Sequence, residues 1–128
     1  MIPRAVREEL LRASAPELVR NWPSQPPTWL QVHIPANAPD ASLAALDPGE
    51  RDAIILSKER KADQLIVDDR QGRREAEKRG IPVIGTLGVM REAATLGLLD
   101  LRTAVKRLGA TSFHIGPEIL KRLLKDRP

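Results

Sequence analysis

Apolar residues recur at helical spacing in several stretches of the chain, and shorter apolar runs lie between these stretches. The helical spacing predicts helices over residues 4–13, 48–61, 70–79, 87–96, 100–108 and 117–124. The short runs predict strands over residues 29–34, 64–67, 81–84 and 113–115. Proline-rich loops are predicted over residues 21–27 and 35–40. Strands that alternate with helices indicate an α/β fold, with a parallel sheet and helices on both of its faces.

One helix start is specified by several residues at once. Asp47 suits the N-cap position, Pro48 the first helical position and Glu50 the third, which is where a capping box places an acid. A helix is therefore predicted to begin directly after Asp47.

Composition narrows the class of protein without deciding its function. The 128 residues fit one compact domain, and we place no boundary within residues 1–128. The chain has no cysteine, which excludes disulfides and thiolate metal sites. No signal peptide and no membrane span is evident, so a cytoplasmic location is expected, with no membrane partner.

The net charge of +4 modestly favours nucleic acid as a partner, because binding releases counterions. Aromatic residues make up only 2% of the chain, and tyrosine is absent. Stacking platforms for unpaired bases are therefore not expected, and the phosphate backbone is the expected contact.

Acidic residues follow or begin several of the predicted elements. Asp68 and Asp69 stand at the end of a predicted strand, where open α/β sheets place their sites. Glu50 and Asp52 lie in the first turn of the preceding helix, and Glu9 lies in the first helix. Clustered carboxylates repel unless a cation neutralises them, and Mg²⁺ or Mn²⁺ prefers such oxygen ligands. Convergence of these acids would create a metal site able to activate water near a phosphodiester.

Each acid also has an ordinary structural interpretation. Glu50 fits a capping box, and Glu9 fits a solvated or ion-paired position on a helix. Asp68 and Asp69 could cap the helix that follows, and capping is favoured for Asp69. Spacing alone leaves these alternatives open.

Basic residues crowd the predicted helix over residues 70–79. Arg70, Arg73 and Arg74 are candidates for contacts with a phosphate backbone. Glu75 and Glu77 are interleaved with the basic residues, so a solvated helix face is an equally good interpretation.

Four segments in chain order carry a resemblance to a known family. They are Val6-x-x-Glu9-Leu10, Leu46-Asp47-Pro48-Gly49-Glu50-x-x-Ala53-Ile54, Leu65-Ile66-Val67-Asp68-Asp69-Arg70-x-Gly72-Arg73 and Gly80-Ile81-Pro82-Val83-x-Gly85-Thr86-x-Gly88. Together they resemble a PIN-like family of bacterial and archaeal proteins related to VapC toxins. The resemblance implies a three-layer α/β/α fold with a central parallel sheet. It also implies a Mg²⁺- or Mn²⁺-dependent ribonuclease, often the toxin of a toxin–antitoxin pair, and a homodimer.

The resemblance assigns roles to particular acids. Glu9 matches the acid of the early helix, Glu50 the acid of the Gly-Glu motif, and Asp68 the aspartate after the later strand. These three are the expected catalytic residues, and with Asp52 and Asp69 they are the expected metal ligands. The family normally opens with a strand that bears a further aspartate. That strand is expected to be missing here, because the segment that normally follows it begins at Ile2.

Three functions follow, in order of preference. The first is an endoribonuclease of the PIN/VapC type, whose activity the missing aspartate could impair. The second is a non-catalytic PIN-like module that binds RNA, dimerises or contacts a protein such as an antitoxin. The third, a nucleotide-binding protein, ranks last because no Gly-x-Gly-x-x-Gly or P-loop pattern occurs.

Overall fold

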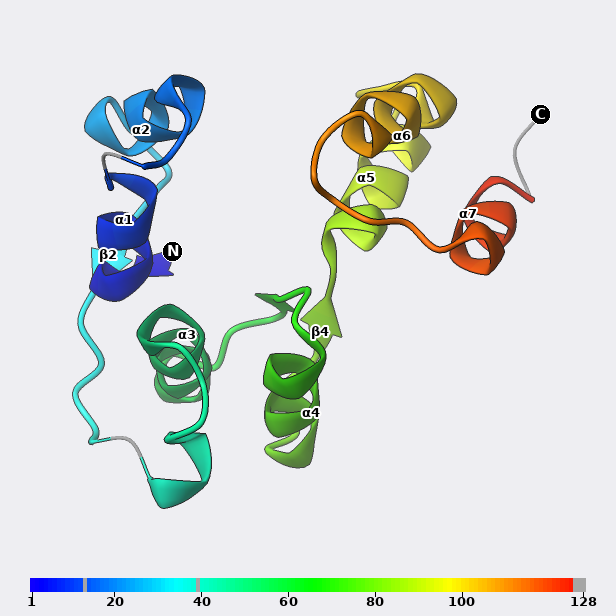
Figure 1. Ribbon diagram of the computed structural model, residues 1–128. Helices are drawn as coiled ribbons and strands as arrows, with labels where there is room; N and C mark the ends of the chain where they lie inside the picture. The colour runs from blue at the N-terminus through cyan, green and yellow to red at the C-terminus, as the bar shows by residue number, and fades with distance from the viewer. Residues whose placement is uncertain (13, 39, 126–128) are drawn as a thin grey trace. The chain divides into compact units, whose positions relative to one another are not determined.

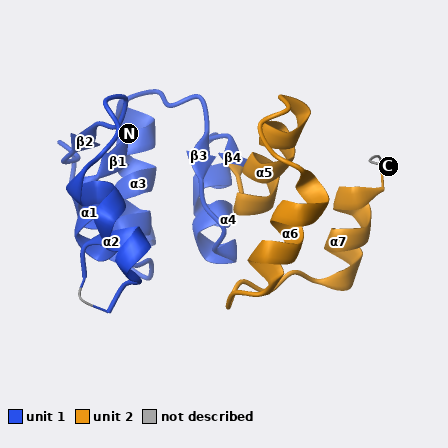
Figure 2. Ribbon diagram, turned by 90° about the horizontal axis from the view of Figure 1, so that it is seen from above, with its two compact units in different colours: residues 1–83 blue, residues 84–128 orange. Residues whose placement is uncertain are grey.

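The computed structural model describes residues 1–12, 14–38 and 40–125. Helices and very short strands alternate along these residues (Figure 1). The chain divides into two compact units, residues 1–83 and residues 84–128, shown in different colours in Figure 2. Residue 13, the predicted end of the first helix, and residue 39 in a predicted loop lie outside the described residues.

The first unit contains eight elements in the described residues and shares a ninth with the second unit. In chain order they are β1 (Ile2–Pro3), α1 (Arg4–Leu10), α2 (Glu17–Ser24), β2 (Val32–His33), the 3₁₀ helix η1 (Ala41–Leu43), α3 (Pro48–Glu59), β3 (Leu65–Ile66), α4 (Arg70–Lys78) and β4 (Val83–Ile84).

The strands form two separate two-stranded sheets. β1 and β2 are parallel, with Ile2 opposite Val32 and Pro3 opposite His33. β3 pairs with β4, and the N–H of Leu65 donates to the carbonyl of Pro82 at 2.8 Å. Each strand has only two residues, so helices supply most of the packing surface.

The core of the first unit lies around α3, which packs against α1, α4, β1 and β3. Ile54 of this helix is 1% exposed. The buried side chains that form one cluster there are Leu43, Leu46, Ile54, Ile55, Leu65, Val67, Ala76 and Ile81. Burial of this apolar surface is the main favourable term holding the unit together.

The second unit is helical in its described residues after β4. It contains α5 (Thr86–Thr95), α6 (Leu101–Gly109) and α7 (Pro117–Leu124). Leu101, Val105 and Leu123 form a small buried core, and partly buried side chains of α5 and α7 pack against it.

The predicted helix starts are confirmed. Asp47 is the N-cap of α3, in extended backbone, and Pro48 is the first helical residue. Asp69 caps α4 by accepting from the N–H of Gly72 at 2.9 Å. Asp100 caps α6 by accepting from the N–H of Thr103 at 3.0 Å.

Three predictions of local structure need correction. Residues 21–24 are not loop, since α2 extends to Ser24 with Pro23 inside it. Pro23 is buried, so packing compensates for the missing backbone donor. The predicted strands at 29–34, 64–67 and 81–84 shrink to two residues each. In the described part of the second unit no strand follows β4, so the strand predicted at 113–115 does not form.

None of the helices in the described residues is long and apolar enough to cross a membrane.

Candidate functional site

A cavity of about 250 Å³ opens in the first unit beside the N-terminus of α3. We call it the acidic cavity. Residues of α1, α3, β3 and the segment after β3 line it, namely Val6, Glu9, Gly49, Glu50, Ala53, Leu65, Ile66, Val67, Asp68 and Asp69. Four of the five acids predicted for a metal site therefore border one cavity.

Gly49 makes room for the carboxylate of Glu9. A Cβ atom at position 49 would lie 2.5 Å from Oε1 of Glu9 and 2.9 Å from its Oε2. Real Cβ atoms do not approach other atoms so closely, so any larger residue at position 49 would displace Glu9. The glycine thus allows an acid from α1 to lie against the first turn of α3.

A second glycine brings two further carboxylates together. A Cβ atom at Gly72 would lie 3.7 Å from Oε2 of Glu50 and 3.7 Å from Oδ2 of Asp69. These two oxygens therefore both lie within 3.7 Å of one point at the start of α4. Acids distant in the sequence are close here because α3 and α4 pack together.

The surroundings of Glu50 disfavour its charged form. Partial burial raises the pKa of its carboxyl group, and the charges of Asp69, Asp47 and Glu9 raise it further. Within the described residues, no donor or cation contacts its carboxylate in a hydrogen bond or an ion pair. The capping-box interpretation of Glu50 is therefore wrong, and its negative charge is left uncompensated.

The other predicted acids differ in their surroundings. Asp68 is exposed and borders the cavity. Asp69 also borders the cavity, but its Oδ2 accepts the capping hydrogen bond from Gly72. Asp52 does not line the cavity, and its Oδ1 pairs with Nε of Arg51 at 3.2 Å. Asp52 therefore pairs with Arg51 and does not border the cavity that the other four acids line.

The donor chemistry around the acidic cavity suits a hard divalent cation. Carboxylate oxygens are the ligands that Mg²⁺ and Mn²⁺ prefer. In the arrangement of the described residues, however, no three acidic or histidine side chains converge closely enough to hold one ion. The residues fit a metal in kind and general location, but they do not form a closed ligand set.

The three candidate RNA-binding arginines lie on the first half of α4. Arg70, Arg73 and Arg74 make no ion pair within the described residues. Glu75 instead holds Lys78 at 3.0 Å and Arg79 at 2.9 Å. The interleaved acid therefore neutralises the end of α4 and leaves its beginning basic, directly after Asp69.

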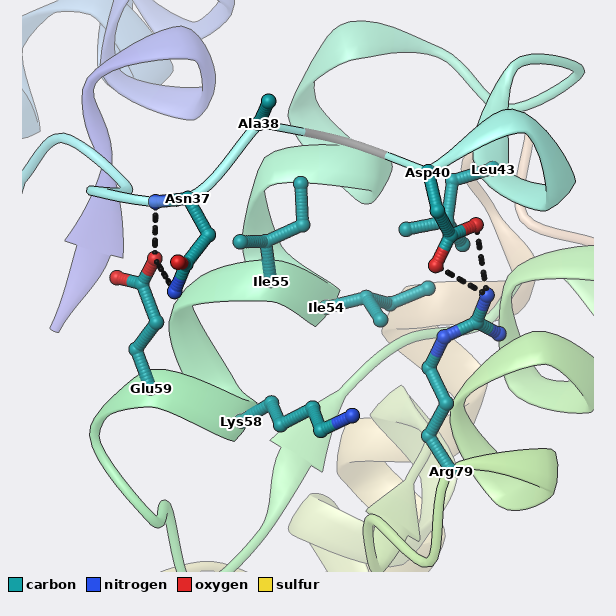
Figure 3. Close-up of a pocket in the computed structure, with 9 residues that line it drawn as sticks. All are labelled: Asn37, Ala38, Asp40, Leu43, Ile54, Ile55, Lys58, Glu59 and Arg79. Carbon is teal, nitrogen blue, oxygen red and sulfur yellow. Dashed lines mark hydrogen bonds and ion pairs between the residues drawn. The ribbon is translucent and has the colours of Figure 1, made fainter.

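A second cavity, of about 310 Å³, lies on another side of α3 (Figure 3). Its carboxylates are already engaged. Glu59 accepts from the backbone N–H groups of Ala36 and Asn37, at 3.1 and 2.7 Å, and these bonds hold its pKa below the ordinary value. Asp40 pairs with Arg79 at 3.2 Å. These groups tie loop segments to helices, so the acidic cavity is the better candidate for chemistry.

Asp47 contributes to the site in a way that the sequence interpretation missed. Its spacing identified it only as an N-cap, yet its side chain makes no capping hydrogen bond. Its charge helps to raise the pKa of Glu50. The available signal was its position three residues before Glu50, directly before the first turn of α3.

Comparison with known proteins identifies the family. A family model described as a PIN domain matches residues 1–127. The chain therefore belongs to the PIN domain family, and the predicted PIN-like α/β fold is confirmed. No curated protein matches the chain, and no solved structure matches it. The relationship to VapC toxins and the missing first strand stay predictions.

Proposed function

We propose that the protein is a Mg²⁺- or Mn²⁺-dependent endoribonuclease of the PIN type, acting at the acidic cavity. Membership of the PIN family supplies a nuclease-like fold. The observation that carries the proposal is the uncompensated carboxylate of Glu50, which faces the charges of three other acids. Such an arrangement costs free energy in the absence of a cation and favours its binding.

Glu9, Glu50 and Asp68 would hold the ion. A divalent cation bound there supplies a water molecule of lowered pKa and stabilises negative charge on the phosphate. Protons compete with the metal for Glu50, because the pKa of this group is raised. Metal binding should therefore weaken steeply at acidic pH.

Two further acids support the site in other ways. Asp69 holds the start of α4 through its bond to Gly72 and adds negative charge beside Glu50. Asp52 is engaged by Arg51, so it is not part of the proposed ligand set.

RNA would approach over the start of α4. Arg70, Arg73 and Arg74 lie immediately after Asp69 and carry charge that no acid in the described residues neutralises. Contacts from these guanidinium groups to phosphates would position the strand without reading its sequence.

The test is cleavage of a labelled single-stranded RNA by the full chain, with Mn²⁺ and then with a chelator. Asp68→Asn should lower the rate about 100-fold, since it removes a carboxylate from the metal. Asp63→Asn is the matched control, because Asp63 is exposed and does not line the cavity. Metal-independent cleavage, or equal rates for both variants, would refute the proposal.

A second candidate function is a non-catalytic PIN-like module that binds RNA. The absence of three converging metal-binding side chains among the described residues favours it. RNA binding that survives chelation, in a protein that cleaves no RNA with Mn²⁺, would support this second function over the first. Homodimers and an antitoxin partner remain predictions under either function.

A further inference from the structure

An apolar groove of about 600 Å³ lies in the second unit, between α6, α7 and the segment that joins them. We call it the basic groove, because Arg102 and Lys106 border its apolar floor. Its apolar floor comes from Val105, Phe113, Ile115, Leu120 and Leu124. Only Val105 of these is fully buried, at 6% exposure, so the others present surface that could contact a partner.

The charged groups that line this groove are all basic or neutral. Arg102, Lys106 and His114 border it, and none of its lining residues is acidic. Lys106 is exposed and makes no ion pair within the described residues. A partner that enters the groove therefore meets apolar side chains below and positive charge at the edge.

Residues 101–125, which form the groove, account for the net positive charge of the chain. Residues 101–125 contain six Lys and Arg residues against one acid, Glu118. Residues 1–100 contain fourteen Lys and Arg against fifteen acids. The basic character is thus concentrated on the helices that form the groove, where it can select partners by charge.

We propose that the basic groove binds an acidic amphipathic helix of another protein. The apolar face of such a helix would lie on the groove floor, and its carboxylates would face Lys106 and Arg102. This inference concerns a surface of the second unit and does not depend on the ribonuclease proposal.

The groove chemistry argues against the other occupants. A second copy of this chain would bring the same basic surface against itself, because a two-fold interface pairs identical patches. RNA would leave most of the apolar floor uncovered, since Phe113 and His114 are the only lining residues whose rings could stack on a base, and the rest of the floor is aliphatic. An acidic amphipathic peptide matches both the floor and the edge.

The binding test uses the full chain and a fluorescein-labelled helical peptide of about 18 residues, with Leu on one face and Glu on the other. Fluorescence anisotropy should show saturable binding of this peptide. A peptide of scrambled order and one with Lys in place of Glu should bind at least about fivefold more weakly. Equal binding of the scrambled peptide would overturn the proposal.

Two adjacent residues of α6 provide a matched pair of variants. Lys106→Glu should weaken binding about fivefold, which corresponds to about 1 kcal/mol. Arg107→Glu makes the same charge change on an exposed residue that does not line the groove, and it should change binding less than about twofold. Equal losses in the two variants would show general electrostatic attraction and contradict a specific groove.

Phe113→Ala tests the floor independently of charge. It should also weaken peptide binding about fivefold while the circular dichroism spectrum stays unchanged. A labelled single-stranded RNA is measured in parallel. If Phe113→Ala leaves peptide binding intact, or if RNA displaces the peptide and Lys106→Glu abolishes RNA binding, the groove serves a different ligand and the proposal fails.

Discussion

Asp69 combines two roles that a pair of substitutions can separate. Its Oδ2 accepts the capping bond from the N–H of Gly72 at 2.9 Å, and its charge raises the pKa of Glu50. Asp69→Ala removes the cap and the charge together. Asp69→Asn keeps an N-cap of similar quality and removes only the charge.

The expected sizes follow from these contacts. Loss of an N-cap costs about 1 kcal/mol of unfolding free energy, and relief of repulsion with Glu50 offsets part of that cost. For a chain of this length, 1 kcal/mol corresponds to a change in Tm of about 3–6 °C. Asp69→Ala should therefore be destabilised by somewhat less than this amount. Asp69→Asn should equal or exceed the wild-type stability.

Urea unfolding followed by circular dichroism measures both variants. Asp100 provides the comparison, because it caps α6 in the same way but faces an attractive charge, that of Arg102. Asp100→Asn should therefore lower stability slightly, the opposite sign from Asp69→Asn. If Asp69→Asn is destabilised as much as Asp69→Ala, repulsion between Asp69 and Glu50 does not lower the stability of the protein, and the reasoning is refuted.

Two further predictions concern the same unit. The folded-state pKa of Glu50 lies above its ordinary value of 4.5, so the folded protein holds this proton more tightly and its stability falls as pH rises through that range. Glu50→Gln should thus gain stability over wild type at about pH 7 and gain little at about pH 4, as urea midpoints would show; an equal difference at both pH values would contradict this. Ile54 is 1% exposed, so Ile54→Ala should lower the free energy of unfolding by about 3 kcal/mol and Ile54→Val by about 1 kcal/mol in the same assay. A loss below about 1 kcal/mol for Ile54→Ala would mean that the core does not lie around Ile54.

Local signals in the sequence located elements where several residues agreed. The run Asp47-Pro48-Gly49-Glu50 marked the start of α3. The helix α2 was missed because Pro23 was interpreted as a loop residue, whereas its burial allows it to remain inside a helix. Tertiary packing decided that case, and packing is not readable from local composition.

The sequence indicated which acids border the acidic cavity, but it did not indicate how their side chains are arranged. Spacing favoured a capping box for Glu50, and the PIN-like resemblance made a site role about as good an interpretation. No capping hydrogen bond to Glu50 forms in the described residues, and its role at a site stays a proposal. Asp52 lies two residues further along α3, just beyond the first turn, and its side chain pairs with Arg51. Which way a side chain leaves its helix depends on neighbouring elements, so sequence spacing could not separate these two acids.

The low aromatic content of the whole chain does not indicate which of its surfaces binds a partner. The basic groove was not predicted at all, because residues 113–115 were interpreted as a strand. Their apolar side chains line the groove instead, since no partner strand is present in the described residues of the second unit.

The acids around the acidic cavity should bind a divalent cation. The most direct measurement is the titration of Mn²⁺ into the full chain at neutral pH, with free Mn²⁺ followed by electron paramagnetic resonance. We expect saturable binding at about millimolar Mn²⁺ or below, lost in Asp68→Asn and retained in the control Asp63→Asn. A wild-type protein that binds no more Mn²⁺ than Asp68→Asn would contradict the account.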